Sequence, residues 1–298
     1  MQRDGPRPNL FIIGSMKSGT SSLHQHLGSH PEVFMCEPKE PGFFVPEMTY
    51  YPKDEAWYRG LFAEAGDARI VGESSTHYTK LPVYAGVPER IQGYSPDARF
   101  IYLVRDPVKR AVSHYWHEVR KRRERRPMLA ALRGSEQYVA FGDYQRQLAP
   151  YFERFGRERV LVLPFEMLVR RPRATLEEVF GWLGVNASQG THVFPRENAR
   201  PEEMEKVRGL GMLHAFAHSS AWGRVAPLAP SWIRRLGSRL ATAPVRPEDT
   251  SDEEAIRYLR PIYREKVERL EEWLGRDFPD WSTVFPERAA APTAAATA

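Results

Sequence analysis

A lysine and four hydroxyl residues follow the first apolar run of the chain, and together they could bind a phosphate or a sulfate. Residues 10–23 read LFIIGSMKSGTSSL, so a β-like segment passes through Gly14 to Lys17 and then to the hydroxyls. A helix that begins in this cluster presents unpaired N–H groups and a positive dipole end to an anion. Glycines let the backbone approach the anion closely, and the lysine adds charge. The run predicts a nucleotide-phosphate loop at the first strand–helix junction.

This loop departs from the common ATP-binding pattern. A Walker A loop has four residues between its first glycine and the sequence Gly-Lys-[Ser/Thr], whereas here Lys17 precedes Gly19. The displaced lysine argues against ATP–Mg²⁺. A P-loop kinase or NTPase stays open as an alternative, with Asp106 as its candidate metal-binding aspartate, and so does a non-catalytic nucleotide-binding module.

A second anion-binding pattern follows the apolar run 100–104. Arg105 comes directly after this run, Pro107 then starts a helix, and Ser113 lies two turns into that helix. An arginine fork beside a hydroxyl suits a terminal phosphate. His117 lies four residues beyond Ser113 and therefore on the same helix face.

A carboxylate beside an aromatic pair lies in the segment EPKEPGFF at 37–44. Near a bound phosphate or sulfate group, such a carboxylate could take a proton from an acceptor hydroxyl or amine. We expect the neighbouring aromatic rings of Phe43 and Phe44 to desolvate it and to raise its pKa toward neutral pH, where a base works best. The residues alone leave both Glu37 and Glu40 as candidates.

These elements occur in order over about residues 9–185 and resemble the sulfotransferases that use PAPS (3′-phosphoadenosine 5′-phosphosulfate), in particular the heparan sulfate and Golgi-type carbohydrate enzymes. The first run resembles their 5′-phosphosulfate loop, Glu-x-x-Phe-Phe their catalytic-base element, and Arg-Asp-Pro-x-x-Arg-Ala-x-Ser-x-Tyr their 3′-phosphate element. The resemblance implies that Glu40 is the base, that Lys17 stabilises charge on the bridging oxygen, and that His117 is a second acid or base. It implies PAPS contacts, with PAP as product and no metal ion, from Lys17, Ser18, Gly19, Thr20, Ser21, Ser22, Arg105 and Ser113.

One element departs from the family. Many relatives read Gly-Glu-Lys-[Ser/Thr]-x-x-Tyr where this chain reads GESSTHY at 72–78, so Ser74 stands in the place of a lysine. This substitution leaves Lys17 as the chief cation expected near the transferring group. His77 is a candidate to compensate or to contact the acceptor.

Strand-like and helix-like runs alternate along the first two thirds of the chain. The predicted strands are 10–13, 69–72, 99–104 and 159–163, and the predicted helices are 20–28, 54–65, 83–93, 107–123, 144–155 and 172–183. Alternation with apolar strands predicts an α/β fold, a P-loop-type parallel β-sheet flanked by helices on both faces. Ligands of such sheets bind beyond the carboxyl ends of the strands, where the loops described above lie.

The sequence after about residue 186 predicts a segment that covers the site. Residues 187–247 read as a helical or irregular C-terminal lid that covers the acceptor, 251–274 as an amphipathic helix, and 287–298 as a disordered tail. We therefore expect a single sulfotransferase domain over 1–286. Two late segments, 198–200 and 208–211, are candidates for a basic loop that closes on the nucleotide.

Bulk properties fit a soluble cytoplasmic enzyme. The chain has 298 residues, a net charge of +5, 42% hydrophobic residues and one cysteine, Cys36, which excludes an internal disulfide. No apolar window of about 18 residues predicts a transmembrane segment, and the polar start predicts no signal peptide. Six basic residues at 120–126 could face a nucleotide or an acidic acceptor, but no nucleic-acid reading module accompanies them.

We therefore expect sulfuryl transfer from PAPS to a hydroxyl, or with less support an amine, of a small-molecule, glycan or lipid acceptor. The sequence does not select among these acceptors, and it does not indicate an oligomeric state. It predicts that PAP binds without a metal ion.

Overall fold

The computed structural model describes residues 5–190, 205–207, 242–244 and 251–289. Most of the predicted lid, including both candidates for the late basic loop, lies outside these residues. No helix among them is long and apolar enough to span a membrane.

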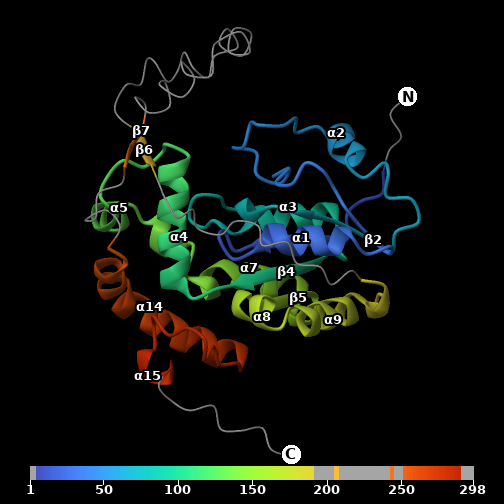
Figure 1. Ribbon diagram of the computed structural model, residues 1–298. Coiled ribbons are helices and arrows are strands. Elements are labelled where there is room, and N and C mark those ends of the chain that lie inside the picture. Colours follow the sequence, from blue (N-terminus) through green and yellow to red (C-terminus); the bar gives the residue numbers. More distant parts are fainter. Residues whose placement is uncertain (1–4, 191–204, 208–241, 245–250, 290–298) are drawn as a thin grey trace, which may run out of the picture.

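A five-stranded parallel sheet forms the centre of the molecule (Figure 1). Its strands are β1 (Leu10–Gly14), β2 (Val33–Met35), β3 (Ile70–Ser74), β4 (Arg99–Val104) and β5 (Val160–Pro164), in the order β2-β3-β1-β4-β5. Residues of β1 pair with β3 on one side and with β4 on the other. Because β1 is central, the loop after it lies between the loops that follow β3 and β4. The predicted parallel α/β fold is confirmed.

Helices cover both faces of this sheet. Their bounds are α1 (Thr20–Gly28), α2 (Glu55–Gly60), α3 (Val87–Tyr94), α4 (Pro107–Arg120), α5 (Met128–Gly134), α6 (Gln137–Ala140), α7 (Tyr144–Phe155), α8 (Phe165–Arg170), α9 (Pro172–Leu183), α14 (Asp252–Leu274) and α15 (Pro286–Ala289). Side chains of β1 alternate between two cores: Leu10 and Ile12 pack with α1, α8 and α9, whereas Phe11 and Ile13 pack with α3, α4, α7 and α14.

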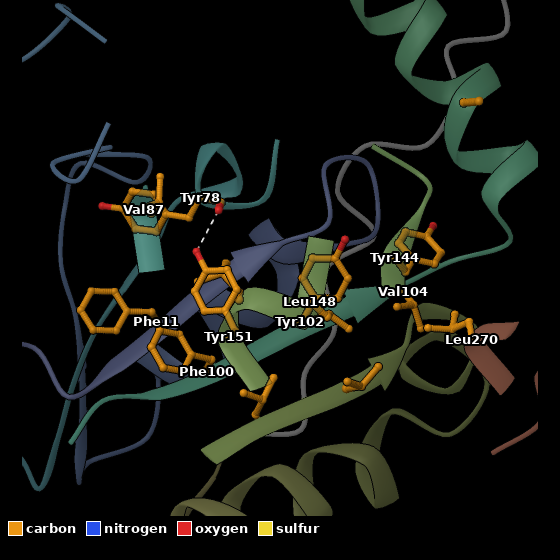
Figure 2. Close-up of a cluster of buried hydrophobic side chains, with 14 of the residues drawn as sticks. Phe11, Tyr78, Val87, Phe100, Tyr102, Val104, Tyr144, Leu148, Tyr151 and Leu270 are labelled. Atoms are coloured by element: carbon orange, nitrogen blue, oxygen red, sulfur yellow. Dashed lines mark hydrogen bonds between the residues drawn. The ribbon is translucent and has the colours of Figure 1, made fainter. Parts of the chain in front are cut away.

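The core that contains Phe11 and Ile13 is rich in aromatic rings and holds in place a turn that follows β3 (Figure 2). Phe11 stacks on Phe100 with ring centroids 5.7 Å apart. The hydroxyl of Tyr151 donates a 2.8 Å hydrogen bond to the backbone carbonyl of Tyr78. Tyr78 belongs to the 3-10 turn η1 (Thr76–Thr79) that follows β3. The core thus fixes η1 against α7 of the same layer.

Some elements differ from the sequence prediction. The short edge strand β2 and the helices α5, α6 and α8 were not predicted, and α2 ends at Gly60 rather than near residue 65. Three residues of β2 carry too little pattern to be recognised alone, and β2 exists because it pairs with β3. Strands β6 (Glu205–Val207) and β7 (Thr242–Pro244) form a separate antiparallel pair within the range predicted as lid.

The expected disordered tail begins inside helix α15. Arg288 lies over the Phe285 ring, 3.6 Å from its centroid, and forms an ion pair with the buried Glu271 of α14. These contacts anchor the first residues of the predicted tail, and residues 290–298 lie outside the described part of the chain.

Candidate active site

A cleft of about 760 Å³ opens at the carboxyl ends of β1, β3 and β4. Its walls come from the loop after β1, the segment after β2, the turn η1 and the helix α4. Nine of the ten predicted site residues line it: Lys17, Gly19, Thr20, Ser21, Ser22, Glu40, Arg105, Ser113 and His117. Segments far apart in the sequence therefore meet in one cavity. The tenth residue, Ser18, is buried behind the loop.

The loop after β1 is shaped to present the first turn of α1 to the cleft. Lys17 and Gly19 have left-handed φ angles of 72° and 87°, and α1 begins after Gly19 without a side-chain cap. A Cβ atom on Gly19 would lie 2.7 Å from the Phe165 ring, so only glycine fits there. The buried hydroxyls of Ser15 and Ser18 hydrogen-bond to each other at 2.6 Å. Contrary to expectation, the Ser18 hydroxyl is thus engaged inside the loop, whereas Thr20, Ser21 and Ser22 line the cleft.

Arg105 joins this loop to the end of β4. Its guanidinium donates a 3.0 Å hydrogen bond to the backbone carbonyl of Lys17 and lies 4.9 Å from the centroid of the Phe165 ring. Burial lowers the pKa of Arg105, but its ordinary pKa is so high that the group stays charged at neutral pH. Ser113 lines the same wall from α4. The arrangement offers a cation and a hydroxyl to one anionic group.

Glu40 lies across the cleft, and its carboxylate receives several donors. Oε1 accepts a 2.7 Å hydrogen bond from the Lys39 ammonium. Oε2 accepts the Thr76 backbone N–H at 2.8 Å and pairs with the His77 ring Nδ1 at 3.1 Å. The Glu40 backbone, at a left-handed φ of 63°, donates to the Ser74 carbonyl. Glu37, the other candidate, is 80% exposed at its side chain and does not line the cleft.

The expectation that aromatic rings raise the pKa of Glu40 is wrong. Phe43 stacks on Tyr58 with centroids 4.0 Å apart, and Phe44 is buried in the core beside Phe11, so both rings face away from the carboxylate. Burial alone would raise the pKa of Glu40, but the hydrogen bond from His77 and the charge of Lys39 outweigh it. The pKa of Glu40 therefore lies well below its usual range.

Ser74, which stands where many relatives have a lysine, does not line the cleft. It is fully buried, and its hydroxyl hydrogen-bonds to the ring Nδ1 of His24 at 2.8 Å. Its neighbour Glu73 is also buried and accepts the hydroxyls of Tyr58, Ser75 and Tyr78 at 2.6, 2.7 and 2.7 Å. Burial raises the pKa of Glu73 to about 7. This carboxyl group holds η1 and its supports in place but does not line the cleft.

Two further lysines in the cleft were missed by the sequence reasoning. Lys39 precedes Glu40, and Lys80 follows η1; both line the cleft together with Lys17. Lys80 is 9% exposed, and burial lowers its pKa to about 8. Lys17 is therefore not the single cation in this part of the site. Nothing local marked Lys80, because its position depends on how η1 folds back over the end of β3.

Helix α4 supplies the remaining wall. His117 lines the cleft, and burial together with the charges of Lys17 and Arg120 lowers its pKa to about 4. From the basic run at 120–126, Arg120, Lys121 and Arg123 line the cleft, whereas Arg126 binds Glu124 at 2.7 Å. The wall is positively charged at neutral pH.

Asp106, the aspartate that the kinase alternative requires, is committed to another role. It is fully buried, and its carboxylate caps α4 by accepting the backbone N–H groups of Val108 and Lys109 at 3.1 and 3.2 Å. It also accepts the hydroxyl and the backbone N–H of Thr283. An aspartate bound in this way does not face the cleft.

Comparisons with known proteins agree on one family. Residues 55–189 match the model of the sulfotransferase family. The chain is 30% identical over 243 residues to human heparan sulfate glucosamine 3-O-sulfotransferase 6, and this match covers 77% of the chain and 67% of the human protein. It is 28% identical over 281 residues to mouse heparan sulfate glucosamine 3-O-sulfotransferase 3A1, with 91% of the chain covered. The chain spans 64% of the length of that mouse protein.

A solved structure matches nearly the whole chain. The sulfotransferase from Alicyclobacillus acidocaldarius has a TM-score of 0.67 and 27% sequence identity, and the match covers 93% of this chain and 99% of that one.

Proposed function

The chain belongs to the sulfotransferase family, and from this premise we propose that it transfers a sulfuryl group from PAPS to a hydroxyl of an acceptor molecule. One observation carries the proposal: Arg105 ties the Lys17 loop to the end of β4 on one side of a cleft, and the Glu40 carboxylate lies on the other side. Cations and a helix N-terminus suit the anionic donor, and a carboxylate suits the proton of the acceptor.

The residues present fit a nucleotide that carries phosphate groups on both the 5′ and the 3′ oxygen of its ribose. The uncapped first turn of α1, with the hydroxyls of Thr20, Ser21 and Ser22, would hold the 5′-phosphosulfate. Arg105 and Ser113 would hold the 3′-phosphate, since a guanidinium fork and a hydroxyl match its oxygens. PAPS, when bound, supplies the sulfuryl group.

Positioning and fixed positive charge account for catalysis in this scheme. Lys17 would neutralise charge that grows on the bridging oxygen as the bond to sulfur breaks, and Lys80 adds a second buried cation in the same cleft. The negative charge of Glu40 would favour removal of the proton from the acceptor hydroxyl, and His117 borders the same space. The low pKa of Glu40 keeps its carboxylate ionised at neutral pH.

The acceptor belongs to the proposal too. Two relatives are named for heparan sulfate glucosamine, so a glycan is the first acceptor class to test, followed by small-molecule and lipid hydroxyls. We infer one domain over 1–286 and a cytoplasmic location in which the free thiol of Cys36 stays reduced.

Isothermal titration with PAP and with ATP–Mg²⁺ tests the proposal. Binding of PAP in the presence of a metal chelator supports it, and binding of ATP–Mg²⁺ alone would favour a kinase or NTPase and refute it. Incubation with labelled PAPS and a panel of glycans, phenols and lipids then identifies the acceptor.

A further inference from the structure

His77 is the one imidazole in the described cleft that is paired with the Glu40 carboxylate. It lies in η1, lines the cleft, and places its ring Nδ1 3.1 Å from Glu40 Oε2. The turn that carries it is anchored on both sides, because the Tyr78 hydroxyl donates to Glu73 and the Thr79 hydroxyl donates to the Ile13 carbonyl. The ring is therefore held by the fold in one place.

The carboxylate determines which ring nitrogen carries the hydrogen. An ionised carboxylate only accepts hydrogen bonds, so Nδ1 of a neutral His77 must be the protonated nitrogen. Nε2 then keeps its lone pair, and no partner for Nε2 occurs among the described residues. In this tautomer His77 presents a hydrogen-bond acceptor at the cleft and Glu40 serves as the group that orients it.

Glu40 itself is badly placed to gain a proton. Its two oxygens already accept from the Lys39 ammonium, the Thr76 backbone and hydroxyl, and the His77 ring. A fifth donor would have to displace one of these, and the pKa of the carboxyl lies far below neutral. Burial also lowers the pKa of His77, which keeps this ring neutral and ready to accept at pH 7. His117 also lines the cleft, and burial lowers its pKa to about 4, but it has no hydrogen bond to the Glu40 carboxylate.

We propose that Nε2 of His77 takes the proton from the acceptor hydroxyl, and that Glu40 acts by fixing the tautomer of His77 and by stabilising its protonated form. The inference rests on the proposed sulfuryl transfer. The acceptor O–H bond breaks and its proton binds Nε2, while the acceptor oxygen forms a bond to sulfur. The bond from sulfur to the bridging oxygen breaks, and its electron pair leaves with PAP. The imidazolium later releases its proton to water.

The groups around His77 suit a proton that is held only briefly. Lys80 and Lys39 disfavour a positive ring in the resting cleft, whereas Glu40 favours it. Tyr84 packs at a centroid distance of 6.1 Å from the ring. Across the same cleft lie Lys17, His117, Glu118, Arg120, Lys121 and Arg123. Burial, the largest cause, and the two lysines lower the pKa of His77 more than the Glu40 carboxylate raises it, so an imidazolium formed during transfer gives up its proton afterwards.

A conservative replacement separates the two possible bases. His77→Asn keeps an N–H that can donate to Glu40 but removes the Nε2 lone pair. With PAPS and a heparan sulfate chain as the acceptor probe, we expect kcat to fall about 100-fold or more, as for loss of a general base, with the PAP affinity unchanged. The acid limb of the wild-type pH–rate profile, at an apparent pKa below 6.5, should disappear. Imidazole added to His77→Ala should restore part of the rate. If His77→Asn keeps more than a tenth of the wild-type kcat with the same acid limb, Glu40 is the proton acceptor and the inference is wrong.

A substrate-independent measurement tests the same tautomer. In protein with ¹⁵N-labelled histidine, the resonances absent from His77→Asn identify His77, and they should report a protonated Nδ1 and an unprotonated Nε2 at pH 7. A protonated Nε2 would overturn the inference. The matched control is Tyr84→Phe, which alters the ring's neighbour without touching the proton path and should leave both nitrogen signals and the acid limb in place. Failure of wild-type protein to bind PAP would instead refute the proposed sulfuryl transfer, and the nitrogen resonances would still decide the tautomer.

Discussion

Removing the guanidinium of Arg105 should weaken PAP binding in a way that depends on the 3′-phosphate. The side chain makes two contacts within the protein, a 3.0 Å hydrogen bond to the Lys17 carbonyl and a stack on Phe165 at 4.9 Å. It also lines the cleft beside Ser113, where we place the 3′-phosphate. Arg105→Ala removes the proposed phosphate contact together with the contact that steadies the Lys17 loop.

The structure sets the size of the effect. Truncating one partner of a buried, hydrogen-bonded charge pair costs about 2–5 kcal/mol of binding free energy. Arg105 is only partly buried, so solvent screening places the cost in the lower half of this range, at about 2–3 kcal/mol. At about 1.4 kcal/mol per decade, the Kd for PAP should rise about 30- to 150-fold.

Calorimetry with two ligands assigns this loss to its cause. PAP and adenosine 5′-monophosphate differ in the 3′-phosphate, so the loss that is specific to PAP measures the contact of Arg105 with that group. We expect adenosine 5′-monophosphate to lose no more than about tenfold, through the loosened Lys17 loop. Arg105→Lys keeps the charge without the planar fork and should fall between wild type and Arg105→Ala. An equal loss for both ligands would show that Arg105 acts through the loop alone, and an unchanged Kd for PAP would refute its placement at the nucleotide.

Three other substitutions follow from the electrostatics of the site. Glu40→Gln should reduce sulfuryl transfer about 100-fold or more and leave the calorimetric Kd for PAP nearly unchanged; normal activity would refute a role for this carboxylate in proton removal. Lys80→Met should raise the free energy of unfolding at pH 7 by up to about 3 kcal/mol, because burial lowers the pKa of Lys80 from 10.5 to about 8. In urea unfolding, this gain should shrink between pH 8 and pH 10.5, because the folded wild-type protein then carries Lys80 in its neutral form. A gain that does not vary with pH would show that burial of the charged lysine is not its cause. The free energy of unfolding of Glu73→Gln should rise relative to wild type by up to about 3 kcal/mol as the pH increases from 4.5 to above 7. Burial raises the pKa of Glu73 to about 7, so the folded wild-type protein has its full stability only while this carboxyl group is protonated. A constant difference between the two proteins over this pH range would show that Glu73 does not titrate there.

Local sequence patterns sufficed for the elements that bind the nucleotide in our proposal. The apolar runs of β1 and β4 are long enough to identify buried strands, and the positions of Gly19 and Pro107 indicate where α1 and α4 begin. Once both strands are placed in a parallel sheet, the residues after them must meet at its carboxyl edge. Arg105 and Lys17 are 88 positions apart in the chain, yet their meeting follows from topology alone.

The acceptor side depended on contacts that no local pattern encodes. Whether Phe43 faces Glu40 or the core is decided by the stack that Tyr58 offers, and Tyr58 lies on a separate helix. Likewise, Lys80 and His77 approach Glu40 because Glu73 and the core fix η1. The sign of the pKa shift of Glu40 depends on the hydrogen bond from the distant His77 as well as on its sequence neighbour Lys39. A motif can therefore place a carboxylate in a site without predicting its protonation.

Backbone conformation adds an independent argument that both sides of the cleft are functional. Among the described residues three that are not glycine hold a left-handed φ: Arg122, which does not line the cleft, and two that do, Lys17 at 72° and Glu40 at 63°. Such a conformation costs about 1–3 kcal/mol for a residue with a side chain, and residues of this kind cluster at active sites. Glycine at either position would remove the strain, but it would also remove the ammonium or the carboxylate that the cleft presents. Because Lys17 and Glu40 line the same cleft, the fold accepts a cost in stability at two points where the proposed sulfuryl transfer needs a side chain.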